Sequence, residues 1–375
     1  MDDIEISIII PTLNEAENLP RLLPRIASAL QGHAWEAIVV DDASTDDTPR
    51  VCAELSQAHP LTLLRREHPD DGLGGAVLMG LRRAQGRFRI VMDADLQHPP
   101  EKLPELITAL NEGAEFVLGS RYVPGGSVGE RWGVFRQINS SIATLLARPF
   151  AGRVRDPMSG FFGIRADVFE RGRKLMPLGY KIALELLCKC RVTDAREVPI
   201  HFAEREAGRS KLSIREQFRY LEHLSRLYDF CYPRLSPIVK FAIVTILTWL
   251  VGLCLFLLCA RAQLDAWGAS IAADFVVLAA TPVFHHRYIR AQRAFLPRPT
   301  PWRDFMLSSI VELLVCAAVA IYLHFRLDTR TFTEMFFLPF LAALAARYVL
   351  RKELLLDVRG LRQDHEIRAR EIGDA

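Results

Sequence analysis

Short apolar runs alternate with stretches of helical character over the first half of this chain of 375 residues. The runs that read as β-strands are residues 5–11, 35–40, 61–65, 88–92 and 116–119. The segments between them have helical periodicity or helix-start signals, as in EAENLPRLLPRIASALQ and EKLPELITALNEG. Nearly continuous apolar strands that are separated by helices are typical of a parallel sheet covered on both faces. The sequence therefore predicts an α/β domain with a mostly parallel sheet.

Polar clusters follow three of these strands: PTLNE (11–15), VVDDAS (39–44) and DADLQHPP (93–100). In open α/β sheets, ligands bind beyond the carboxyl ends of the strands. We expect Asp93, Asp95 and Gln97 to project to one side of an extended chain, where the carboxylates repel each other unless a cation lies between them. Mg²⁺ or Mn²⁺ takes ligands from one or two carboxylates together with substrate phosphates. The pattern therefore indicates a metal that is shared with a nucleotide diphosphate.

Other sites of similar composition fit less well. A calcium loop requires glycine at the sixth position, which is His98 here. The segment DGLGGA (71–76) lacks the full GxGxxG spacing and does not follow the first strand. The pair Cys188 and Cys190 has no second cysteine pair for zinc, and the seven cysteines fit a reducing compartment. A net charge of only +3 does not indicate nucleic-acid binding.

From residue 238 onward the composition changes, with apolar stretches at about 238–260, 268–284, 305–325 and 332–350. The first is long enough to cross a bilayer, which takes about 20 residues. The segment 285–304 holds five arginines and the C-terminal tail is again basic. Because positive loops stay inside, we expect an integral protein with four spans and both termini in the cytoplasm. The opening MDDIEISIII has acids where a signal peptide is basic, so the first domain is expected to remain cytoplasmic.

Two features of this C-terminal part leave alternatives open. Residues 213–231 form a basic amphipathic pattern, which suits either a helix at the membrane interface or an ordinary core-facing helix. Asp274 and Glu312 fall within predicted spans, where an acid indicates a functional site; the alternative is that the second span begins beyond Asp274.

A set of motifs then occurs in a recognisable order: PTLNE, VVDDAS, DADLQHPP, GSRYVPGG, DPMSGFF, GYKIALEL and GRSKLS. In this the chain resembles family 2 glycosyltransferases of the polyprenyl-phosphate type, and within them the dolichyl-phosphate mannose synthases with a four-helix membrane domain. The resemblance covers about residues 4–230. It implies a GT-A fold, metal dependence, and transfer with inversion from a nucleotide diphosphate sugar to a lipid phosphate. It also implies a catalytic domain (1–212), a juxtamembrane helix region (213–237), a transmembrane domain (238–350) and a cytoplasmic tail (351–375).

The same resemblance implies roles for individual residues. Those expected to bind the nucleotide sugar are Pro11, Leu13, Glu15, Val40, Asp42, Asp93, Ala94, Asp95, Gln97, Arg205 and Lys211. Asp95 and Gln97 would hold the metal, and Arg205 and Lys211 would neutralise the diphosphate. Those expected to receive the acceptor phosphate are Arg121, Arg136 and Ser140, so the catalytic set is Asp93, Asp95, Arg121 and Arg136. Asp156 and Glu185 also match family positions, in a functional or a structural role.

The residues themselves also suggest roles at the second strand end. Asp42 is well placed to accept hydrogen bonds from a base or ribose, and we expect Asp41 or Asp42 to cap the helix that begins in STDDTPRV. Leu13 stands where related mannose synthases carry an aromatic residue, which weakens both a stacking role for this position and the inference of a guanine base. The chemistry itself needs no strong base, because a phosphate monoester has a second pKa of about 6 and is largely ionised at neutral pH.

Several functions therefore remain open at this stage. The donor is GDP-mannose by family weight, with UDP-glucose and related sugars as alternatives, and the lipid is dolichyl or undecaprenyl phosphate. A processive polysaccharide synthase is disfavoured because its QxxRW motif is replaced by EQFRY at 216–220. A lipid-sugar translocator or membrane scaffold is a further alternative, in which the spans carry the function.

Overall fold

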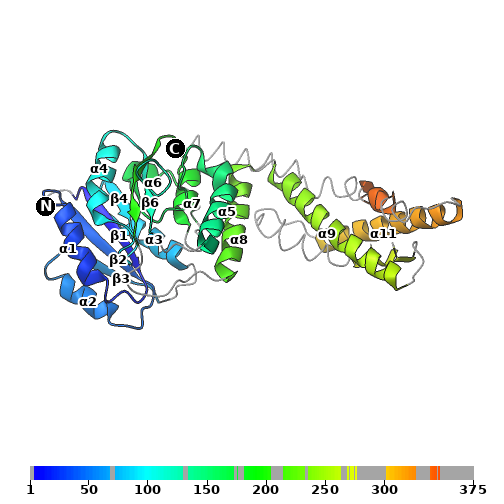
Figure 1. The fold of residues 1–375 in the computed structure, drawn as a ribbon, viewed down its shortest axis with the longest axis horizontal. Coiled ribbons are helices and arrows are strands. Elements are labelled where there is room, and N and C mark those ends of the chain that lie inside the picture. Colours follow the sequence, from blue (N-terminus) through cyan, green and yellow to red (C-terminus); the bar gives the residue numbers. More distant parts are fainter. Residues whose placement is uncertain are drawn as a thin grey trace. The chain divides into compact units, whose positions relative to one another are not determined.

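The structure is a computed structural model of the chain (Figure 1). It describes residues 4–67, 72–129, 134–172, 175, 181–203, 214–232, 235–262, 268–269, 271–273, 275–276, 301–326, 338–343 and 345–346. The chain divides into two compact units, Met1–Leu227 and Tyr228–Ala375.

The first unit contains a seven-stranded sheet in the order β3-β2-β1-β4-β7-β5-β8. Its strands are β1 (Ile6–Thr12), β2 (Trp35–Asp41), β3 (Leu61–Arg65), β4 (Phe88–Val91), β5 (Phe116–Ser120), β7 (Phe162–Arg165) and β8 (Ala195–Pro199). A small second sheet pairs β6 (Ser127–Val128) with β9 (His201–Phe202). Strand β7 runs antiparallel to both of its neighbours, and the other pairs are parallel. The predicted mostly parallel sheet and its five strands are confirmed, whereas β7 and β8 were not predicted.

Helices cover both faces of this sheet (Figure 1). One face carries α1 (Leu19–Ala29), α2 (Thr48–Leu55) and α4 (Leu103–Asn111); the other carries α3 (Gly72–Arg83), α5 (Val134–Ala151), α7 (Ile182–Lys189) and α8 (Ile214–Cys231). Two short helices, η1 (Pro100–Lys102) and α6 (Ala166–Phe169), complete the unit. Every residue of β1 is buried: Ile8 and Ile10 pack on the first face and Ile9 on the second. Apolar side chains on both sides of a strand are what a doubly covered parallel sheet requires.

Close packing of α3 onto the sheet helps to fix the position of the site. A Cβ atom on Gly80 would lie 2.4 Å from Ile9 Cγ2, so this approach of helix and strand depends on glycine. The register places Thr12 beside Asp41 and Ile9 beside Val91. The carboxyl ends of β1, β2 and β4 therefore meet at one edge of the sheet, as the sequence predicted.

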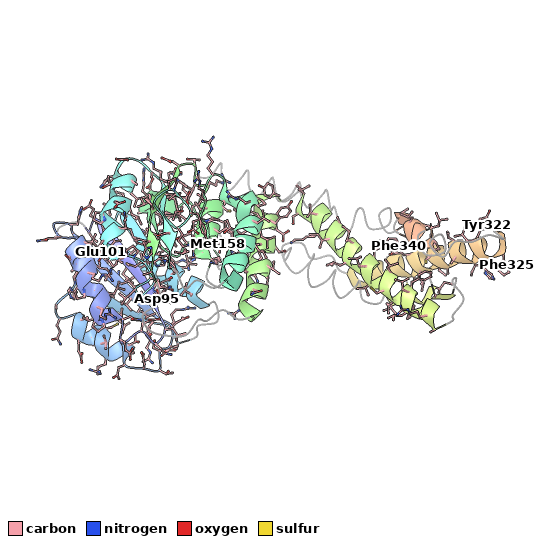
Figure 2. The ribbon with its side chains drawn as sticks, in the orientation of Figure 1. Asp95, Glu101, Met158, Tyr322, Phe325 and Phe340 are labelled. Carbon is pink, nitrogen blue, oxygen red and sulfur yellow. The ribbon has the colours of Figure 1, made fainter. Side chains whose placement is uncertain are left out.

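The second unit contains two long helices, α9 (Ser236–Arg261) and α11 (Pro301–Arg326). They occupy two of the predicted apolar stretches, 238–260 and 305–325. Apolar side chains are exposed on both helices, among them Leu258 on α9 and Tyr322 and Phe325 on α11, the last two labelled in Figure 2. Within the part of the chain that the structure describes, no helix has the length and apolarity needed to cross a bilayer. The four-span arrangement stays a prediction.

Other predictions for the C-terminal half have different outcomes. Helix α8 occupies the predicted amphipathic stretch. Glu312 is fully buried on α11, while Asp274, residues 285–300 of the arginine-rich segment and the tail lie outside the described residues. The domain boundaries at residues 212, 237 and 350 stay predictions.

Candidate active site

The loops that follow β1, β2 and β4 share an unusual backbone feature. Each contains a residue other than glycine in the left-handed region: Asn14 with φ 58°, Ala43 with φ 58° and Leu96 with φ 62°. Such residues cost free energy and persist where the surrounding structure holds them, which is frequent at functional sites. Three strained residues on three neighbouring strand ends therefore mark this edge as the candidate active site.

The first two loops are locked together by hydrogen bonds. The Asn14 side-chain oxygen accepts from the Thr45 amide at 2.8 Å, and the Asn14 amide donates to Ser44 Oγ at 2.8 Å. Asp41 is fully buried and holds the loop from inside, because both the hydroxyl and the amide of Ser44 donate to its carboxylate. The expectation that Asp41 or Asp42 caps α2 was wrong. The cap residue of α2 is Asp47, and Asp46 accepts from the Thr48 amide at 3.0 Å.

Asp42 lies at the rim and is paired with a residue that the sequence reasoning missed. Arg66 Nη1 donates to Asp42 Oδ1 at 2.5 Å and to the Gly72 carbonyl at 2.8 Å. Both side chains of the ion pair are largely buried, 6% and 12% exposed. Arg66 follows the predicted strand 61–65 directly, so its place at the same strand edge was the available signal. The pair fixes the direction of the Asp42 carboxylate.

The loop after β4 carries Asp93, Asp95 and Gln97. The strand ends at Val91 and the chain bends instead of continuing extended, so the predicted one-sided projection was wrong. The physical reason is an Asx-type turn, in which the Gln97 amide donates to Asp95 Oδ1 at 3.2 Å across the left-handed residue Leu96. Asp95 and Gln97 are each 7% exposed, whereas the Asp93 side chain is 34% exposed. The three side chains still lie on one short loop at the sheet edge; Figure 2 labels Asp95 in the first unit.

The environment of Asp95 and Gln97 fits a metal ion that takes only a few of its ligands from the protein. Gln97 Nε2 donates to the Ala203 carbonyl at 3.0 Å, so its carbonyl oxygen is the atom that the side chain could offer to a metal. Within the described residues, no group of three or more histidine, cysteine or acidic side chains is placed to hold a metal ion. A hard cation that keeps several waters and binds one or two carboxylates plus phosphates needs no such cage. The donor set therefore fits Mg²⁺ or Mn²⁺ and not a closed protein site.

His98 supports this loop from the interior. Its ring is 2% exposed and stacks on Phe161 at 5.5 Å between centroids, with Phe202 on another side at 5.3 Å. The Asp93 amide donates to His98 Nδ1 at 3.2 Å. Burial lowers the pKa of His98 to about 4, because its effect outweighs the opposing attraction of the Asp95 carboxylate. The ring is therefore neutral at physiological pH.

Arg121 is expected to bind the acceptor phosphate, and the structure shows what holds it. Its Nε and Nη2 donate to the two carboxylate oxygens of Asp156 at 2.7 and 2.8 Å. Asp156 is fully buried. Burial alone would lower the pKa of Arg121, but the hydrogen bonds and charge of Asp156 raise it, so the guanidinium stays charged. The Phe202 ring lies 5.3 Å from the guanidinium carbon and thus touches both Arg121 and His98.

Lys181, to which no role was assigned from the sequence, belongs to the same group of charges. Its Nζ donates to the Met158 carbonyl at 3.3 Å, and Met158 lies on the loop that also carries Asp156. Burial and then the positive charge of Arg121 lower the pKa of Lys181 to about 7, against the attraction of Asp156 and Asp93. Its presence within the motif GYKIALEL was the only signal in the sequence.

The remaining predicted residues fall into three groups. Pro11, Val40 and Ala94 are buried at the same edge of the sheet, and Leu13 and Glu15 lie on its first loop. Arg136 and Ser140 belong to α5, and their side chains, like all of Arg205 and Lys211, lie outside what the structure describes. Glu185 is buried on α7 and pairs with Lys189 at 2.5 Å and with His223 at 3.4 Å, in the helix layer. The roles assigned to these residues stay predictions.

Comparisons with known proteins agree with this architecture. Residues 7–173 match the model of glycosyl transferase family 2. The dolichol-phosphate mannosyltransferase of Pyrococcus furiosus is 44% identical over 244 residues, which is 64% of this chain and 68% of the relative. That of Mycosarcoma maydis is 42% identical, over 64% of this chain and 83% of the relative. The polyprenol monophosphomannose synthase of Mycolicibacterium smegmatis is 37% identical, over 55% of this chain and 80% of the relative.

A solved structure resembles the chain more distantly. The glucosyl-3-phosphoglycerate synthase of Mycobacterium tuberculosis, in complex with Mn²⁺, UDP and glucosyl-3-phosphoglycerate, is 22% identical with a TM-score of 0.47, over 61% of this chain and 80% of that one. The sequence relatives are the stronger finding, because the chain covers more than two thirds of each at 37–44% identity. The chain belongs to glycosyl transferase family 2 and is a glycosyltransferase related to the dolichol-phosphate mannosyltransferases.

Proposed function

We propose that this enzyme transfers mannose from GDP-mannose to a polyprenyl phosphate, with inversion, at the cytoplasmic face of a membrane. The observation that carries the proposal is one strand edge that joins Asp42, Asp93 and Asp95 with the buried Arg121 pair. An acidic rim that would hold a divalent metal for the donor diphosphate, beside a fixed guanidinium for the acceptor phosphate, suits two substrates that both carry phosphate. The names of the curated relatives support the sugar and the lipid class.

The donor diphosphate is expected at the loop after β4. Asp95 and Gln97 would hold Mg²⁺ or Mn²⁺ there, and the metal would neutralise charge that develops on the leaving diphosphate. Arg205 and Lys211 would act on the same diphosphate. The described chain that precedes them is fixed at this loop, because the Ala203 amide donates to the Gln97 carbonyl at 3.0 Å and Gln97 Nε2 donates to the Ala203 carbonyl at 3.0 Å.

The acceptor phosphate needs positioning more than deprotonation. One of its oxygens forms the bond to the anomeric carbon while the bond from that carbon to the donor diphosphate breaks, and the electron pair leaves with the diphosphate. Arg121 would hold the incoming phosphate, together with Arg136 and Ser140. Because Asp156 accepts hydrogen bonds from both Nε and Nη2 of Arg121, the guanidinium has one orientation before substrate arrives. Asp93 would contact the donor sugar from the other side.

A bilayer would bring the lipid phosphate to this site. We propose that the C-terminal unit anchors the chain in the membrane with the catalytic unit and both termini cytoplasmic. The exposed apolar side chains of α9 and α11 support an apolar environment for these helices, among them Ile246, Leu250, Leu258 and Phe325.

A transfer assay tests the proposal with purified full-length protein, a short-chain polyprenyl phosphate, Mg²⁺ or Mn²⁺, and either GDP-mannose or UDP-glucose. We expect mannosyl lipid from GDP-mannose, loss of product with EDTA, and loss of product in Asp95→Ala. Asp167→Ala, which removes an exposed carboxylate far from the site, is the matched control. If product forms with UDP-glucose and not with GDP-mannose, then GDP-mannose is the wrong donor and UDP-glucose takes its place in the proposal. Nucleotide-independent lipid transport without turnover would favour the translocator and overturn the proposal.

A further inference from the structure

His98 occupies a position that neither the metal nor the phosphates account for. It follows Gln97 directly, yet its ring is 2% exposed and packs between Phe161 and Phe202 instead of facing the rim. The interplanar angles are 27° with Phe161 and 59° with Phe202. A ring held on two sides by aromatic neighbours has little freedom to turn, so its nitrogen atoms have fixed directions.

The hydrogen bond from Asp93 determines which ring nitrogen carries the proton. The Asp93 amide donates to His98 Nδ1 at 3.2 Å. A nitrogen that accepts a hydrogen bond has no proton, so the proton of the neutral ring is on Nε2. Nδ1 therefore acts as a fixed acceptor inside the loop, and the bond from residue 93 to residue 98 closes the loop on itself.

The Asp93 carboxylate lies beside the same ring, and because Nδ1 carries no proton the two groups form no ion pair. Asp93 Oδ2 lies 3.7 Å from His98 Nδ1. On another side a Cβ atom on Gly160 would come 3.0 Å from Asp93 Oδ2 and 3.3 Å from His98 Cε1. Glycine at position 160 thus leaves just enough room for the carboxylate and the ring together. Asp93 is held at its backbone amide, and its side chain remains 34% exposed.

The loop needs such a support because its own conformation is unfavourable. Leu96 is in the left-handed region with φ 62°, which costs free energy. Without an internal acceptor, the buried start of the loop would relax toward a conformation that lowers this cost. Asp93 would then point elsewhere.

We propose that His98 is a positioning residue, whose Nδ1 fixes the Asp93 backbone and thereby directs the Asp93 carboxylate toward the sugar donor. This inference rests on the proposed function, in which Asp93 contacts the donor. It assigns His98 no contact with substrate. The effect is expected in kcat, because a misplaced reacting group costs rate even when the nucleotide still binds.

Substitutions of His98 can distinguish the role of its hydrogen-bond acceptor from the role of its aromatic ring. An asparagine side chain can place its oxygen near the position of Nδ1, whereas a glutamine side chain reaches the position of Nε2. His98→Asn and His98→Gln therefore both lose the aromatic contacts, and only His98→Asn retains an acceptor for the Asp93 amide. His98→Phe does the reverse, since it keeps the ring and loses the acceptor.

The experiment measures kcat, the donor KM and hydrogen exchange of the peptide 92–97 in the full-length protein and these variants. We expect His98→Gln and His98→Phe to lower kcat by about 100-fold, with the donor KM within about 3-fold of wild type, and to speed exchange at Asp93. His98→Asn should keep kcat within about 10-fold and keep the Asp93 amide protected. If His98→Asn loses as much activity as His98→Gln, or if His98→Phe retains wild-type kcat, the inference is wrong.

Hydrogen exchange separates this inference from the proposed function. If the exchange pattern is as expected but wild-type protein transfers no sugar from any donor, the proposed function fails while the His98 support stands. If sugar transfer is robust but the Asp93 amide exchanges equally in wild type and His98→Phe, the proposed function stands and the inference about His98 fails.

Discussion

The buried pair of Arg121 and Asp156 gives a prediction with a built-in control. Asp156→Ala removes a fully buried carboxylate and leaves the Arg121 guanidinium, 10% exposed, without it. Breaking a buried pair on one side costs about 3–5 kcal/mol, because a desolvated charge remains. The pair of Arg165 and Asp167 has the same two-pronged geometry, at 2.9 and 2.8 Å, but Asp167 is 54% exposed. Asp167→Ala should therefore cost at most about 1 kcal/mol.

The measurement is urea unfolding of the full-length variants, combined with hydrogen exchange of the peptide 116–122. Exchange reports the site directly, because the Arg121 amide itself donates to Asp156 Oδ2 at 3.1 Å. We expect faster exchange there in Asp156→Ala and no change in Asp167→Ala. A third variant removes both charges, Arg121→Met with Asp156→Leu, and should recover much of the lost stability because no unpaired charge is left.

One outcome would refute this reasoning. If Asp156→Ala and Asp167→Ala lose equal stability, or if the double variant is less stable than Asp156→Ala, then desolvation of Arg121 does not dominate the energetics of the pair. Arg121 would then be hydrated, and its fixed orientation at the acceptor site could not be ascribed to Asp156.

Three further predictions test other parts of the site. The pKa of Lys181, lowered by burial and by Arg121 to about 7 from 10.5, means that the unfolded chain binds more protons between these values. The stability of wild type relative to Lys181→Met should thus rise by up to about 1.4 kcal/mol per pH unit between pH 7 and 10, and a flat difference in urea unfolding would contradict the burial of Nζ. Ala43, with φ 58°, should tolerate glycine with a thermal midpoint equal to or above wild type, whereas Ala43→Val should lower it; a higher midpoint for valine would exclude a left-handed residue there. Arg66→Met should raise the donor KM by about 10-fold with a smaller change in kcat, since Asp42 loses the partner that orients it, and an unchanged KM would remove Asp42 from the donor site.

Much of the fold follows from patterns that are local in the chain. Five strands and their helices were predicted because a buried parallel strand is a short apolar run, and a covering helix repeats its apolar residues every three or four positions. The strand ends could also be predicted to meet, since parallel strands align their carboxyl ends at one edge. The sequence alone therefore predicts that Asp42, Asp93, Asp95 and Gln97 belong to one site.

The tertiary structure decided what depends on residues distant in sequence. Strand β7 lies antiparallel between β4 and β5, although no local pattern distinguishes FGIR as a strand or gives its direction. Arg121 meets Asp156 across 35 positions, and Gln97 meets Ala203 across 106. The bend at Leu96, the acceptor role of His98 and the depressed pKa of Lys181 likewise come from burial and packing. Local periodicity follows from the geometry of a single strand or helix, whereas desolvation and pairing of charges exist only once the chain has brought distant side chains together.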